Sequence, residues 1–94
     1  MATLFRFAGV FFVIYTQEHP PAHVHVKSHQ KRPDWEIRIY LGRREDGGED
    51  NYGRSFGDVS IRAGNPKMSK IDEYVDYLAE HINEAWALWE SINP

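Results

Sequence analysis

The sequence predicts an α+β domain in which a small antiparallel sheet is covered on one face by a long C-terminal helix. Short segments with alternating apolar and polar residues fill the first two thirds of the chain, which indicates strands. Apolar residues in the last third recur every three or four positions, which indicates a helix. Because the strands precede the helix and do not alternate with helices, we expect three to five antiparallel strands within about 4–62, a helix over about 66–92, and one domain over 1–94.

The most hydrophobic stretch covers residues 4–15, where Gly9 interrupts an otherwise apolar run. We expect a short strand over 4–7 and a central strand over 10–15, joined by a bulge or tight turn at the glycine. In the next segment, over 22–27, small apolar residues alternate with His23, His25 and Lys27. The apolar residues should enter the core and the imidazoles should stand on the opposite face of the sheet.

Two further strands complete the predicted sheet. Residues 34–41 alternate cleanly, so we expect Trp35, Ile37, Ile39 and Leu41 to face inward, and Asp34, Glu36, Arg38 and Tyr40 to face outward. Residues 42–53 are polar and rich in glycine, which predicts a loop too polar to order itself by burial. A last strand over about 55–62 should bring Val59 and Ile61 to the core.

Two starts are open for the C-terminal helix. Asn65 can cap it with Pro66 at the first helical position, or Ser69 can cap it with Asp72 three residues later. A hinge near Asn83 is an additional expectation, because asparagine is a weak helix former. The predicted apolar face consists of Ile71, Tyr74, Val75, Leu78, Ile82, Ala85, Trp86 and Trp89.

Four of the five histidines fall within eleven residues, at positions 19, 23, 25 and 29. Side chains two residues apart on a strand are roughly 6.5–7 Å apart at their roots, close enough to converge on one ion or one phosphate. If the strands over 22–27 and 34–41 are neighbours, as we expect, one face that is left to solvent carries His23, His25, Glu36, Arg38 and Tyr40.

Composition and charge limit the functional classes. Hydrophobic residues make up 41% of the chain, which argues against disorder, and the absence of cysteine excludes disulfides and thiolate metal sites. Arg6 interrupts the apolar N-terminal run and no stretch is long enough to span a bilayer, so we expect no signal peptide, no membrane contact and a cytoplasmic location. Residues 1–44 hold seven Lys/Arg against three Asp/Glu, whereas residues 45–94 hold four against eleven. The basic residues beside the histidines could attract a polyanion.

The segment Glu18-His19-Pro20-Pro21-Ala22-His23-Val24-His25-Val26, with Arg6-Phe7 and Gly9 before it and Pro66-Lys67, His81 and Trp89-Glu90 after it, resembles a small bacterial family of unknown function (DUF four-one-six-zero). The resemblance covers nearly the whole chain. Members usually read Pro-Pro-His, whereas Ala22 intervenes here, and the loop over 43–52 is longer than usual. The family's genes are arranged like toxin–antitoxin pairs, so the resemblance implies a toxin-like effector with an antitoxin-like protein partner or self-association.

Our first functional hypothesis is a ribonuclease that needs no metal. Imidazoles titrate near neutrality, so two of them can act as general base and general acid on a phosphodiester beside a 2′-hydroxyl. The predicted catalytic residues are His19, His23 and His25, with Arg38 to bind the phosphate; Lys27 is an alternative to Arg38.

The alternative hypothesis is a metal-binding or protein-interaction module without catalysis, in which His23 and His25 bind a divalent transition metal. His19, Glu18, Glu36 or His81 could supply a third ligand. In the absence of cysteine, such a site suits catalytic Zn, Ni, Mn or non-haem Fe better than structural Zn. A purely structural role for the histidines, as turn or exposed strand residues, stays open, and we expect His81 to be a packing residue.

Overall fold

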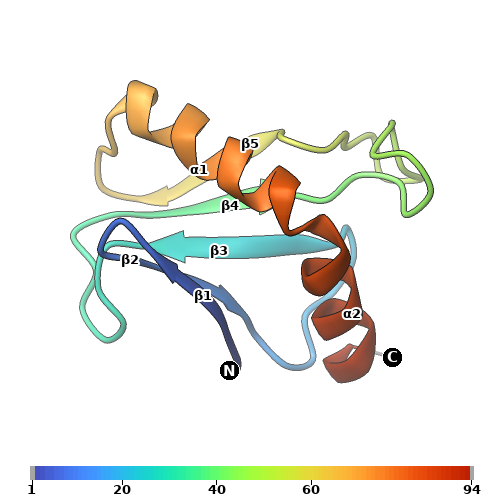
Figure 1. Cartoon of the computed structure of the whole chain (residues 1–94), viewed down its shortest axis with the longest axis horizontal. Helices are drawn as coiled ribbons and strands as arrows, with labels where there is room; N and C mark the ends of the chain where they lie inside the picture. The colour runs from blue at the N-terminus through green and yellow to red at the C-terminus, as the bar shows by residue number, and fades with distance from the viewer. Residues whose placement is uncertain (1, 94) are drawn as a thin grey trace.

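A computed structural model, which describes residues 2–93 and side chains from residue 5 onward, confirms the α+β architecture (Figure 1). All neighbouring strands are antiparallel, and their spatial order follows the chain, β1-β2-β3-β4-β5. The elements are β1 (Ala2–Phe7), β2 (Val10–Ile14), β3 (His23–Lys27), β4 (Glu36–Tyr40), β5 (Val59–Ala63), α1 (Met68–Glu80) and α2 (Ile82–Ile92). Among residues 2–93, no helix combines the length and apolar character that crossing a membrane requires.

Gly9 forms the predicted tight turn. The two residues between β1 and β2, Ala8 and Gly9, have φ angles of 52° and 79°, and the strands pair directly from Phe7 to Val10. Positive φ at both positions of a two-residue hairpin loop matches the twist of the strands that it joins. Glycine adopts such an angle without the steric cost that a side chain brings.

The hydrophobic core lies between one face of the sheet and the helices. The strands contribute Phe12, Val24, Val26, Ile37 and Ile39, all fully buried, and α1 lies across the sheet above them in Figure 1. The α1 residues Ile71, Tyr74 and Leu78 belong to the same cluster. Strand residues two apart share a face, so His23, His25 and Lys27 necessarily point away from this core.

The helix predicted over 66–92 is two helices in the structure, because the chain breaks at His81 (φ −120°, ψ 27°). The break lies two residues before the expected hinge at Asn83. It lets α1 cross the sheet while α2 lies beside the end where β3 begins (Figure 1). Neither expected cap is used, since α1 begins after Lys67 without a side-chain capping bond. The His81 ring packs against Phe5 and Tyr77, as expected of a packing residue.

Ile61 was expected in the core, but 54% of it is exposed. It lies in β5, the edge strand, where of the two residues only Val59 packs against the core cluster. Residues 42–53 form a loop, as predicted, but the strand expected over about 55–62 begins only at Val59, so the loop continues to residue 58. Side-chain hydrogen bonds organise this loop. Asp50 accepts bonds from the backbone of Tyr52 and Arg54, the pattern of an Asx turn.

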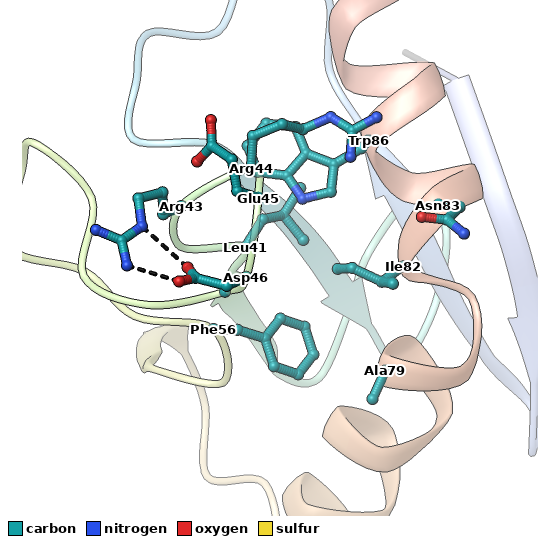
Figure 2. A pocket seen from close by; sticks show the side chains of 11 residues that line it. Leu41, Arg43, Arg44, Glu45, Asp46, Phe56, Ala79, Ile82, Asn83 and Trp86 are labelled. Atoms are coloured by element: carbon teal, nitrogen blue, oxygen red, sulfur yellow. Dashed lines mark hydrogen bonds and ion pairs between the residues drawn. The ribbon is translucent and has the colours of Figure 1, made fainter.

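A pocket of about 350 Å³ lies between this loop and the junction of α1 and α2 (Figure 2). At its rim, Arg43 donates two hydrogen bonds to Asp46, of 2.9 and 2.7 Å. These bonds hold the pKa of the Asp46 carboxyl at about 2. The guanidinium of Arg44 lies over the Trp86 ring, 5.4 Å from its centroid. Both arginines near this pocket are therefore already engaged by side chains of the protein.

Candidate metal centre

Strands β3 and β4 are neighbours, as the sequence predicts. His23 pairs with Tyr40, His25 with Arg38, and Lys27 with Glu36 across an antiparallel ladder. Directly opposed residues in such a ladder project to the same side of the sheet. Both histidines, Glu36 and Arg38 therefore share the face opposite the helix-covered core.

The expectation that this face is open to solvent is wrong at the histidines. The exposed fractions of His23, His25 and Lys27 are 2%, 3% and 5%. The cover comes from long side chains and from the segment between β2 and β3. Burial of polar groups requires hydrogen-bond partners, and the contacts of the two imidazoles supply most of them.

Three side chains cover the histidines. The Tyr15 ring lies edge-on against His25, with centroids 4.5 Å apart, and its hydroxyl accepts a 2.9 Å bond from Lys27 Nζ. The ring of Trp89, from α2, packs against the His23 ring, with centroids 5.4 Å apart. Glu18 projects from the segment between β2 and β3 toward both imidazoles.

The position of Glu18 depends on the C-terminal end of α2. The Glu18 backbone N–H donates a 2.7 Å bond to Asn93 Oδ1, while Asn93 Nδ2 donates to the Tyr15 carbonyl at 3.2 Å. A single side chain more than seventy residues away thus fastens the covering segment at Tyr15 and at Glu18. No local sequence pattern reports this clamp.

His25 lies between two carboxylates. Its Nδ1 is 2.8 Å from Glu36 Oε2, and its Nε2 is 2.7 Å from Glu18 Oε1. Carboxylates accept hydrogen bonds, so both contacts are hydrogen bonds only if each ring nitrogen carries a hydrogen. A cation that bound Nε2 would replace the hydrogen shared with Glu18, and the Glu36 bond would keep the ring in place.

His23 has one nitrogen engaged and one free. Its Nδ1 donates to the Pro21 carbonyl at 2.7 Å, which places the hydrogen on Nδ1 and leaves a lone pair on Nε2. This Nε2 is buried without a hydrogen-bond partner and lies 3.5 Å from Glu18 Oε1. The lone pair is thus aimed at the same carboxylate that contacts His25.

The three side chains Glu18, His23 and His25 have the geometry of a metal-binding group. One ligand atom from each lies within 4.8 Å of the other two. Ligands about 2.1 Å from a tetrahedral Zn²⁺ are roughly 3.4 Å from one another. The distance from His23 to Glu18 already has this value, and the distance of 2.7 Å from His25 to Glu18 must widen by a fraction of an ångström.

The pKa directions favour the ligand forms of two of these groups. Burial lowers the pKa of His23 below its ordinary 6.5, assisted by the charges of His25 and Arg38 and opposed by the Pro21 bond and Glu18. For Glu18, burial raises the pKa, but the His25 hydrogen bond and the nearby positive charges outweigh it and bring the value below 4.5. At neutral pH His23 is therefore a neutral imidazole whose Nε2 lone pair can bind a metal, and Glu18 is an ionised carboxylate.

Family models, curated proteins and solved structures were compared with this chain, and none matches it. The resemblance to the small bacterial family therefore stays a prediction from its motifs. The functional argument rests on the geometry of the site itself.

The structure brings some of the sequence-predicted site residues together and places others apart. His23, His25 and Arg38 come together on one face, whereas His19 is exposed and lines a pocket of about 440 Å³ beside Glu18. Of the four residues considered as a third ligand, Glu18 lies at the imidazoles. Glu36 instead holds the outer nitrogen of His25. The roles of Tyr15, Lys27 and Asn93 were not anticipated.

The metal-free protein is expected to lose stability as the pH falls from 6.5 toward 4.5. The folded chain binds a proton on His23 less readily than the unfolded chain, so acid favours unfolding once the pH falls below the ordinary value of 6.5. Glu18 adds a second loss below 4.5. Urea unfolding in the presence of a chelator measures the trend, and His23→Gln should flatten it in the upper window. An equally steep trend in His23→Gln would contradict the assignment to His23.

Proposed function

We propose that this protein binds a divalent transition-metal ion through His23 Nε2, His25 Nε2 and a Glu18 carboxylate oxygen. One observation carries the proposal: both Nε2 atoms face the same carboxylate, while each Nδ1 is held from behind by another acceptor. Metal-binding histidines characteristically donate their second N–H to a carboxylate or a backbone carbonyl, which fixes the tautomer and the ring orientation. Glu36 and the Pro21 carbonyl fill these two outer positions.

The ligand set indicates the class of metal chemistry. Two imidazoles and one carboxylate suit Zn²⁺ and non-haem Fe²⁺, and with only three protein ligands Zn²⁺ retains a position for water or a substrate. A bound water there becomes acidic enough to act as a nucleophile near neutral pH. The open side is the Glu18 side, where the pocket lined by His19 and Trp89 lies. This arrangement suits a reactive centre better than a purely structural one.

The metal-independent ribonuclease predicted from His19, His23, His25 and Arg38 receives less support from the geometry. A general acid and a general base must reach the atoms of a bulky phosphodiester. His23 and His25 are nearly fully buried, and three of their four ring nitrogens already contact acceptors of the protein. A metal ion needs only the inner nitrogens, so the same burial suits it.

Metal titration of protein purified without a histidine tag tests the proposal. We expect one equivalent of Zn²⁺ per chain by calorimetry and by elemental analysis after dialysis, together with a higher unfolding temperature. His29→Ala is the matched control, because His29 is exposed and lies outside the ligand group, so it should bind like the wild type. A wild type that does not retain a stoichiometric ion, or a His29→Ala variant that loses the ion, would overturn the proposal. RNA cleavage that persists in a chelator would support the ribonuclease instead.

A further inference from the structure

Two buried side-chain nitrogens in the described part of the chain lack a hydrogen-bond partner, His23 Nε2 and Arg38 Nε. Both belong to the same face of the sheet, where Arg38 on β4 lies directly opposite His25 on β3. A buried polar atom without a partner requires an explanation, such as a bound ion or ligand. The two atoms call for different partners: His23 Nε2 has a lone pair that can bind a cation, whereas Arg38 Nε has an N–H that can donate to an anion.

The balance of charges around the site also favours a bound anion. Glu18 and Glu36 carry two negative charges, which Lys27 and Arg38 balance. No carboxylate among residues 5–93 lies within ion-pair distance of Lys27 or Arg38. A divalent cation at the three ligands would leave the face with two unbalanced positive charges in a mostly buried setting. Buried charge that is not paired is costly, so such a centre favours an anion.

We propose that the metal centre takes a small oxyanion, with one oxygen on the metal and a second on Arg38 Nε. This inference rests on the proposed metal centre and names the class of ligand that it accepts. The ligand group is a carboxylate or a phosphate, because each carries at least two oxygens on one central atom, so that one oxygen can bind the metal while another accepts a charge-assisted hydrogen bond from the guanidinium. The coordination position that three protein ligands leave open would hold the first oxygen.

The route to this position passes Glu18. The Glu18 side chain is 19% exposed, and it lines the pocket of about 440 Å³ together with Gln17, His19, Pro20, Trp89, Ile92 and Asn93. The oxyanion group would bind at the metal and Arg38, and the rest of the ligand molecule would occupy this pocket. The pocket next to Arg43 and Arg44 offers no comparable anion site, because Arg43 is bonded to Asp46, and Arg44 lies over Trp86 and pairs with Glu90.

Cobalt substitution tests the inference, because the visible absorption of Co²⁺ changes when its coordination changes. Inorganic phosphate and acetate are titrated separately into the Co²⁺-loaded protein, so the two arms show which oxyanion is preferred. We expect a saturable spectral change in the wild type. Arg38→Gln should bind Co²⁺ as well as the wild type and the anion at least about tenfold more weakly, since it loses a charged hydrogen bond.

Arg54→Gln is the matched control. Arg54 also carries a positive charge, but its guanidinium lies over the Tyr40 ring, 4.4 Å from the centroid, so its loss should leave the anion affinity unchanged. A Co²⁺-loaded wild type that responds to neither anion, or an Arg38→Gln variant that binds the anion normally, would overturn this inference alone. If the wild type does not bind Co²⁺ at all, the metal centre and the inference both fall.

Discussion

The substitution His25→Ala is expected to lower the metal affinity by far more than about a hundredfold. The substitution removes one of three protein ligands, whereas loss of an outer partner of a ligand typically costs roughly 10–100-fold. It also leaves Glu18 and Glu36 without the ring that separates them, and both carboxylates are mostly buried. Calorimetric titration with Zn²⁺ measures the affinity, and circular dichroism establishes that the variant is folded.

Glu36→Gln separates binding of the metal from orientation of the ligand. A glutamine oxygen can still accept the His25 Nδ1–H, but the negative charge is lost, so we expect a loss within about 10–100-fold. The predicted order of affinity is therefore wild type, then Glu36→Gln, then His25→Ala. A His25→Ala variant that is folded and binds as tightly as Glu36→Gln would show that His25 is not a ligand.

Phe12→Ala is expected to reduce the free energy of unfolding by about 3–5 kcal/mol, the usual cost of removing a buried aromatic ring. Phe12 is fully buried and contacts the rings of Phe5, Tyr74 and Tyr77. It is thus the point where β1, β2 and α1 meet. The total free energy of unfolding of a domain is about 5–15 kcal/mol, so the variant should be only marginally stable. Urea unfolding measures the change.

The neighbouring residue is the control for this prediction. Phe11 has the same side chain on the other face of β2, where it is partly exposed beneath the Arg6 guanidinium. Its replacement by alanine should cost less than about 1.5 kcal/mol, because little of the ring is removed from a packed core. Equal costs for the two variants would contradict the placement of the core on the α1 face.

The strands were predictable because their alternation reflects a physical period of two, and the core residues of β3 and β4 follow it. The break at His81 was anticipated only as a hinge near Asn83, because the apolar spacing of α1 and α2 continues across it. Ile61 was misplaced for a related reason. Alternation reports which side of a strand a residue faces, but not whether a helix reaches far enough to cover an edge strand.

At the site, the sequence identified the histidines and their face but not their surroundings. His23 and His25 stand out by spacing, and the pairing with Arg38 follows from neighbouring strands. Their burial depends on Trp89 and on the Asn93 clamp, which come from the distant C-terminal helix. Such long-range contacts leave no local pattern. The choice of Glu18 over His19 as the third group also depends on that clamp.

The most direct test of the metal centre is nuclear magnetic resonance of the imidazole nitrogens during Zn²⁺ titration. Long-range ¹H–¹⁵N spectra distinguish Nδ1 from Nε2 in each ring and show which nitrogen binds the metal. We expect one equivalent of Zn²⁺ to shift the Nε2 signals of His23 and His25, while both Nδ1 atoms stay protonated and His19 and His29 are unaffected. Binding through Nδ1, or at His19 and His29 in place of the buried pair, would contradict the proposed centre.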